Sequence, residues 1–286
     1  MKKILLATTM LIGTAGFAAA EVALSGSAAM GVGRDGAGGG SHTSNDGLVH
    51  AYSTATVTAT MSGESDSGLS FGASISIGTG TSYAFADDDG FNAEGLGSSS
   101  EVFLSGAFGK IAMKVDNAGL GQYKAYQADD AKGYDLQYTH TVGGLDLGVR
   151  YDVDGDAADG DSSVSLGYKM DALSFGLAYD ADGAWGASAS YAMDAITVTA
   201  ATDDASVSSI KIAYSANGLS ASAKVANDNS HDIALGYSAN GVGVNVSTNE
   251  ADEWSASASY DLGGGASLAG GMNYADDAYV GVSFSF

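Results

Sequence analysis

One stretch of the chain carries acidic residues at nearly every second position: Asp152, Asp154, Asp156, Asp159 and Asp161. Carboxylate oxygens are the ligands that Ca2+ prefers in proteins. A calcium-binding EF-hand loop also needs a glycine at its sixth position and a glutamate at its twelfth, whereas Ala157 and Ser163 stand at those positions here. Two interpretations therefore stay open. The stretch is a solvated acidic loop, or it is a weak Ca2+ site with Asp152, Asp154 and Asp156 as candidate ligands.

No other residues have the spacing of a catalytic or metal-binding site. The histidines are scattered over different segments, at positions 42, 50, 140 and 231. This scatter does not match the spacing of metal ligands. Serines are abundant, so spacing alone leaves a Ser-His-acid site open, but nothing marks one serine as a nucleophile. The glycines at 263–265 are typical of a turn, because no helix follows that could cradle a phosphate. We therefore predict no enzyme, no catalytic residue and no resident cofactor.

A second group of charged residues consists of single basic side chains between apolar neighbours. Lys114 follows Met113, and Arg150 follows Val149. The other members of this group are Lys169, Lys211 and Lys224. Side chains of a β-strand point alternately to its two faces, so these cations share one polar face. A charge that faces lipid at the midplane of a bilayer costs about 2–4 kcal/mol, so the polar face must be the one in contact with water.

The strands that present these side chains are most regular in the second half of the chain. Tyrosines at 168, 191, 214, 237 and 260 are spaced by 23 residues, and each stands just before a short turn. Two of these turns contain Asn-Gly pairs, at 217–218 and 240–241, which are a strong hairpin signal. Apolar and polar residues alternate on both sides of the turns, as strands require. The pattern predicts an array of similar β-hairpins.

Earlier segments alternate in the same way and give further strands. Expected strands run over 21–33, 49–61, 69–77, 101–108, 111–115, 134–142 and 145–152, with the pair 101–108 and 111–115 joined across Gly109-Lys110. Longer loops lie at 34–48, 79–99, 118–132 and 153–161. Counting the tight turns gives 18 strands and no helix after residue 20.

The distribution of aromatic residues distinguishes a membrane barrel from a soluble sandwich. Tyr168 and its four repeats lie at the tight-turn ends of strands. A second group lies nearer the loop ends: Tyr151, Tyr179, Trp185, Trp254 and Tyr274. Two such girdles are typical of barrels whose aromatic rings sit at both bilayer interfaces. The opposite face consists mostly of Ser, Thr, Gly and Asp, which cannot form a dry core. We predict an all-β, transmembrane, antiparallel up-and-down barrel.

Composition agrees with export and argues against nucleic-acid binding. Residues 1–20 combine Lys2 and Lys3, an apolar middle and the small residues Ala18-Ala19-Ala20, which predicts a cleaved signal peptide. The barrel then occupies 21–286. Loss of the two lysines takes the formal charge from −23 to −25, the wrong sign for a nucleic-acid surface. The chain has no cysteine and no proline, as expected for a nearly all-strand protein without disulfides.

Four stretches resemble the general diffusion porins of alphaproteobacteria: 21–32, 66–77, 101–113, which includes SGAFGK at 105–110, and 259–286. The resemblance implies a homotrimer in the bacterial outer membrane, in contact with its lipids, that passes small hydrophilic solutes and ions. It also implies that Phe286 is the terminus presented to the barrel-assembly machinery. Family members usually have 16 strands, so the expected number is 16–18.

The resemblance also implies an inward third loop, which the segment at 118–132 would supply. This segment is shorter than usual in the family and carries Lys124, Asp129, Asp130 and Lys132. Together with Lys114, Arg150, Lys169, Lys211 and Lys224, these are the predicted pore-lining residues. Arg150 is the expected partner of Asp129 or Asp130 on the wall.

Three functions stay open on the sequence. The preferred one is a passive channel, which the acidic composition predicts to favour cations. The alternatives are an outer-membrane surface or adhesion barrel without a channel, and a soluble, secreted acidic repeat protein.

Overall fold

The computed structural model describes residues 21–34, 48–83, 91–92, 98–114, 135–153 and 162–286, and these form β-strands joined by turns. The strands are β1 (Glu21–Arg34), β2 (Val49–Glu64), β3 (Ser70–Tyr83), β4 (Phe91–Asn92), β5 (Ser98–Gly106), β6 (Gly109–Met113), β7 (Leu136–Val142), β8 (Leu145–Tyr151), β9 (Ser162–Met170), β10 (Leu173–Asp180), β11 (Trp185–Met193), β12 (Ile196–Asp203), β13 (Ser208–Ala216), β14 (Leu219–Ala226), β15 (His231–Ala239), β16 (Val242–Asn249), β17 (Trp254–Gly263), β18 (Ala266–Asn273) and β19 (Ala278–Ser285). Among these residues there is no helix long and apolar enough to cross a membrane.

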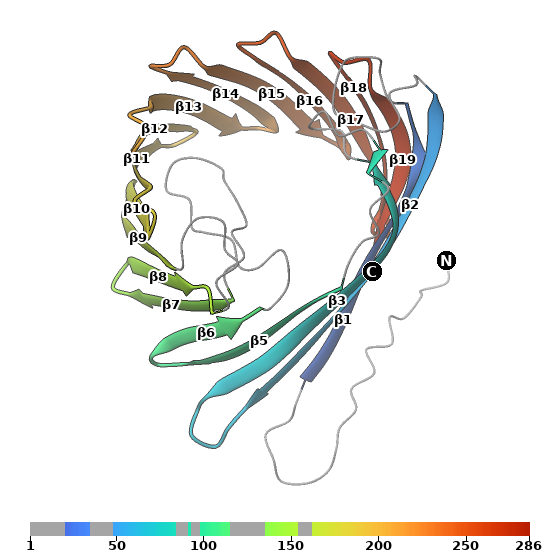
Figure 1. Cartoon of the computed structure of the whole chain (residues 1–286). Coiled ribbons are helices and arrows are strands. Elements are labelled where there is room, and N and C mark those ends of the chain that lie inside the picture. The colour runs from blue at the N-terminus through green and yellow to red at the C-terminus, as the bar shows by residue number, and fades with distance from the viewer. Residues whose placement is uncertain (1–20, 35–47, 84–90, 93–97, 115–134, 154–161) are drawn as a thin grey trace.

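The strands close into a ring (Figure 1). Each strand pairs antiparallel with its neighbours in the chain, β3 pairs directly with β5, and β1 pairs with β19. The two-residue strand β4 pairs with the end of β3 and is not part of the ring. The described residues therefore form a closed barrel of 18 strands, which confirms the count of tight turns rather than the usual family number.

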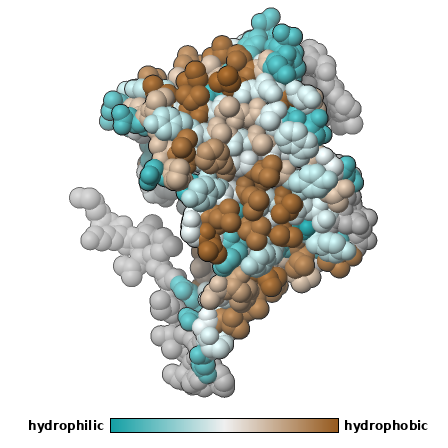
Figure 2. Space-filling view, turned by 90° about the vertical axis from the view of Figure 1, so that its left-hand side faces the viewer, coloured by the Kyte–Doolittle hydropathy of each residue, from teal (hydrophilic) through white to brown (hydrophobic). Residues whose placement is uncertain are grey.

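The outer face of the barrel is apolar. Leu24, Ile77 and Val225, from three different strands, are 70%, 60% and 57% exposed. Only two hydrophobic residues of the described chain, Ala112 and Ala178, are buried. Figure 2 shows hydrophobic residues gathered over one side of the barrel, with hydrophilic residues toward its upper edge. A water-soluble protein of this size buries its large apolar side chains, so this outer face fits lipid instead of water.

The predicted aromatic residues lie at the two ends of this apolar face. Tyr168, Tyr191, Tyr237 and Tyr260 are exposed near the tight-turn ends of their strands. Trp185 and Trp254 are the first residues of β11 and β17, at the opposite end of the barrel wall, and both are exposed. The same parity that places these rings outward places the residues beside them toward the lumen.

The 23-residue repeat of the sequence reappears as a repeated register. Leu173 pairs with Tyr191, Ile196 with Tyr214, Leu219 with Tyr237, and Val242 with Tyr260. The turns that follow the tyrosines begin with a residue in the left-handed region, at Asp171, Asp194, Asn217 and Asn240. Asn and Asp tolerate this conformation better than other non-glycine residues. Gly218 adds a second positive φ, and a Cβ there would lie 2.1 Å from the carbonyl oxygen of Ser238.

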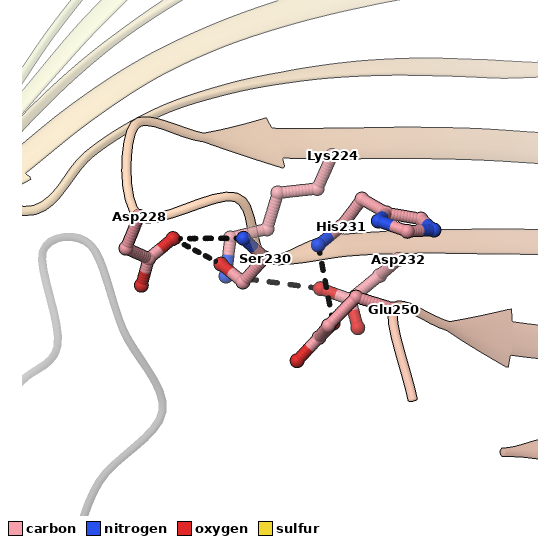
Figure 3. Close-up of polar contacts among 6 residues, drawn as sticks. All are labelled: Lys224, Asp228, Ser230, His231, Asp232 and Glu250. Carbon is pink, nitrogen blue, oxygen red and sulfur yellow. Dashed lines mark hydrogen bonds and ion pairs between the residues drawn. The ribbon is translucent and has the colours of Figure 1, made fainter. Parts of the chain in front are cut away.

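Four-residue loops join the strands at the other end of these hairpins, and most are closed by one side chain. The Oδ1 atom of Asp203 accepts the N–H of Val207 at 2.8 Å, and that of Asn249 accepts the N–H of Glu253 at 3.1 Å. Asp180 and Asn273 do the same for Ala184 and Asp277. The equivalent residue in the loop after β14 is Ala226, which has no such acceptor. There, Asp228 accepts both the N–H and the hydroxyl of Ser230, at 2.9 and 2.7 Å (Figure 3).

The ring is closed by the first and last strands. Gly26 and Phe286 exchange backbone hydrogen bonds of 3.2 and 2.9 Å, so the final residue belongs to the wall. The ring of Tyr52 lies over two glycines of this seam. A Cβ on Gly31 would be 2.6 Å from the Tyr52 hydroxyl, and one on Gly281 would be 1.9 Å from it. Glycines at these two positions therefore let an aromatic ring cover the seam from inside.

The alternation along β14 predicts which positions meet water in a bilayer. Single cysteines replace residues of the two faces in turn, in a chain that has no native cysteine. Ser220→Cys, Ser222→Cys and Lys224→Cys should react with a membrane-impermeant thiol reagent. Ala221→Cys, Ala223→Cys and Val225→Cys should stay unreacted because they face lipid. The two sets interleave on one strand, so depth in the membrane is matched. Equal reaction of both sets would contradict the assignment of faces.

The loop after β14 should depend on the ionised form of Asp228. The hydrogen bonds from Ser230, the backbone one first, hold the pKa of this exposed carboxyl below its ordinary value of 3.8. Because the pKa is lowered by folding, the closed loop is stabilised above the ordinary pKa, and this contribution is lost as the pH falls through the lowered pKa. An NMR titration of the Asp228 side chain should therefore have its midpoint below 3.8.

Ser230→Ala serves as the matched variant for this titration. It removes the hydroxyl bond but keeps the backbone bond, so the midpoint should move only part of the way back. A midpoint at or above the ordinary value in the unaltered protein would contradict the loop geometry.

Candidate functional site

The candidate site is the inner wall of the barrel. The inward residues of β2 are mainly threonines, at 54, 56, 58 and 60, and those of β17 are serines, at 255, 257 and 259. Hydroxyls of neighbouring strands pair along the wall, as those of Ser247 and Ser255 do at 2.7 Å and those of Ser190 and Thr199 at 2.8 Å. A ring of this many strands encloses a lumen too wide for side chains to fill, and hydroxyl-lined walls keep it wet.

Three of the predicted basic residues lie in one continuous cross-strand row. Register pairs follow one another from β9 to β16 through Lys169, Ser174, Ser190, Thr199, Lys211, Lys224, Asp232 and Asn249. Every member of the row is polar. Lys169 and Lys211 are exposed, so their ammonium groups are available to lumenal water. Spacing along the sequence does not reveal this row, because its members come from eight strands.

Arg150 lies in a different environment. It is 7% exposed, and its cross-strand neighbours are Gln137 on β7 and Ser163 on β9. With its amide oxygen turned toward the guanidinium, Gln137 accepts hydrogen bonds of 2.9 Å from both Nε and Nη2. Asp152 and Asp180 are buried on the same face. A buried guanidinium needs a hydrogen-bond partner, and Gln137 holds this one against the wall.

Lys114, the remaining predicted residue that the structure describes, follows β6 and is half-buried. Its N–H donates to the carbonyl oxygen of Asp135 at 2.9 Å. Four predicted pore-lining residues, Lys124, Asp129, Asp130 and Lys132, lie outside the described residues. The proposed contact between Arg150 and Asp129 or Asp130 is therefore still a prediction.

The structure moves one hairpin turn and thereby reveals a charged pair that the sequence did not predict. The hairpin turn that we expected at Gly109-Lys110 lies at Ala107-Phe108, and Gly106 pairs with Gly109. This was a wrong assignment, because it treated the glycine as a turn residue although it opens β6.

In the correct register Lys110 faces inward with Glu101, and Nζ lies 2.8 Å from Oε1. The ammonium also lies 4.7 Å from the centre of the Phe103 ring. Counting back by two from Lys114 would have placed Lys110 on the lumenal face.

The acidic residues do not form a metal site within the part of the chain that the structure describes: no three Asp, Glu, His or Cys side chains there are arranged to hold a metal ion. Of the Ca2+ candidates, Asp152 is buried, whereas Asp154 and Asp156 lie outside the described residues. The weak Ca2+ site is still a prediction.

Solved structures share this architecture. A mutant of the porin of Rhodopseudomonas blastica matches with a TM-score of 0.55 and 15% identity, over 93% of this chain and all of that one. A second mutant of the same porin gives 0.54 and 15%, with the same coverage. Another porin structure gives a TM-score of 0.53 and 23% identity, again over 93% and 100% of the two chains. At these identities the matches show the fold. No curated protein sequence matches the chain.

The amino-acid sequence shows the family to which the chain belongs. The profile of Gram-negative porins matches residues 7–278, almost the whole chain. This family and the barrel fold point to a channel rather than an enzyme. The chain thus belongs to the Gram-negative porin family, and its barrel is a porin channel of the outer membrane.

Proposed function

We propose that the barrel lets small hydrophilic solutes and ions cross the outer membrane by passive diffusion. The observation that carries this proposal is the closed 18-strand ring with apolar residues outside and hydroxyl and charged residues inside. Hydroxyl and charged groups on the described part of the wall bond to water as well as to solute, so small polar solutes pass without being held tightly. Conductance of the purified protein in a planar lipid bilayer tests the proposal, and a protein that inserts without conducting would contradict it.

The described loops give little support to the alternative of a surface or adhesion barrel. Five of the connections at the loop end, from β10 to β19, have only four residues each: 181–184, 204–207, 227–230, 250–253 and 274–277. Side chains of their own hairpins close most of them. Adhesion by a barrel needs larger folded loops that present a surface to a partner.

Several further properties belong to the same proposal. Residues 1–20 serve as a cleaved signal peptide, and three copies of the barrel assemble into a trimer. Phe286, whose side chain is 71% exposed, is the terminus that the barrel-assembly machinery recognises. Its backbone position at the seam supports this role, because the last residue must pair with β1 for the ring to close.

The channel should prefer cations. The formal charge is −23 for the whole chain and −25 without residues 1–20, and a low-dielectric wall focuses the field of fixed charges on permeating ions. In a KCl gradient near 0.1 M, the reversal potential should have the sign of K+ selectivity. The same measurement near 1 M is the control, because the Debye length there falls to about 3 Å and the preference should shrink. A preference for Cl− at the lower concentration would contradict this proposal.

A further inference from the structure

Two lysines of the lumenal wall stand directly opposite each other. Lys211 on β13 and Lys224 on β14 are register partners, and both face inward. Like charges directly opposite on antiparallel strands repel and destabilise the pair. A neutral solute gains nothing from this arrangement, whereas an anion between the two ammonium groups relieves the repulsion.

The wall supplies one carboxylate to this pair. Nζ of Lys224 lies 3.8 Å from Oδ2 of Asp232, the next member of the row (Figure 3). Lys211 is exposed and has no ion pair or hydrogen bond from its ammonium group to any residue that the structure describes. The two lysines and Asp232 therefore leave about one positive charge, centred on Lys211.

A hollow of about 300 Å3 adjoins Lys211 between β13 and β17, and most of the residues that line it have lumenal parity. Its lining includes Lys211 and the small polar side chains of Ser220, Ser222, Asn245 and Ser247. Gly236 lines its floor, and a Cβ there would lie 2.4 Å from Oγ of Ser220 and 2.7 Å from Oδ1 of Asn245. The missing side chain thus leaves hydroxyl and amide groups facing a common space. This volume is at the lower end of small-molecule sites and suits a single sugar ring.

We propose that Lys211, Lys224 and this hollow form a weak subsite for small hydroxylated anions, such as monosaccharide phosphates. The ammonium group of Lys211, which lines the hollow, binds the anionic group together with that of Lys224, its register partner just outside the lining. Ser220, Ser222 and Asn245 exchange hydrogen bonds with the sugar hydroxyls. The inference rests on the proposed channel, since solutes reach the subsite through the lumen. It concerns one place on the wall, and the whole pore still prefers cations because of its total charge.

Calorimetric titration of the detergent-solubilised protein with glucose 6-phosphate tests the subsite without requiring any current. Glucose 6-phosphate should bind more tightly than glucose. Lys211→Gln should weaken the binding by about three- to fivefold, the factor expected for loss of one ion pair that water still reaches. Lys211→Arg keeps the charge and should preserve most of the binding.

A variant that is expected to strengthen binding separates recognition of the anion from a general structural effect of mutation. Asp232→Asn removes the carboxylate that competes for Lys224, so glucose 6-phosphate should bind more tightly than to the unaltered protein. Ser222→Ala should weaken glucose 6-phosphate but leave inorganic phosphate unchanged, because only the sugar reaches the hydroxyl. Heat-dependent migration on gels verifies that each variant is folded.

Several outcomes would overturn the subsite. Equal affinity for glucose and glucose 6-phosphate, no effect of Lys211→Gln in a folded barrel, or weaker binding to Asp232→Asn would each do so. A protein that binds glucose 6-phosphate as described but carries no current in bilayers would support the subsite and contradict the proposed channel. The two proposals therefore fail separately.

Discussion

The pairing of β1 with β19 is the interaction on which the rest of the structure depends. A strand inside a bilayer has no water to bond its backbone, and each unpaired N–H or C=O costs several kcal/mol. An open sheet would leave two such edges, one on each terminal strand. Here Ser27 to Arg34 pair with Ala278 to Ser285, and Gly26 continues the ladder to Phe286. Every strand of the ring then has two neighbours, and only a closed ring encloses a lumen.

In the closed ring, large apolar side chains lie on the outer face and polar side chains on the inner face, the reverse of a water-soluble protein. The described chain has almost no buried hydrophobic residue, because its large apolar side chains are on the outer face. Stability must come from the continuous hydrogen-bond ladder and from lipid contact, since the residues that the structure describes form no apolar core. The inner face is free to carry charge. Its charges differ in exposure: Arg150 is held within the wall by Gln137, whereas Lys211 extends into water.

Most of the fold could be predicted because two short-range signals repeat. Alternation assigns each residue to a face, and the tyrosines at intervals of 23 locate the turns, so the strand count could be predicted. The turn between β5 and β6 could not be located in this way, because Gly106 and Gly109 are equally acceptable turn residues in sequence and only pairing decides between them. The row from Lys169 to Asn249 could not be predicted, because it depends on the stagger between neighbouring strands. No pattern within a single strand determines that stagger.

The repeated register also bears on how such a chain could evolve. Each 23-residue unit from β10 onward starts and ends at the same edge of the wall, with equivalent pairs such as Leu173–Tyr191 and Ile196–Tyr214. Duplication or loss of one unit would change the ring by two strands and would leave β1 and β19 antiparallel. A single inserted residue is also absorbed: the bulge between Asp261 and Gly263 lengthens one unit without disturbing the pairing of β18 with β19. The number of strands in such a barrel therefore changes during evolution by whole hairpins, two strands at a time. A 16-strand relative differs from this ring by one hairpin.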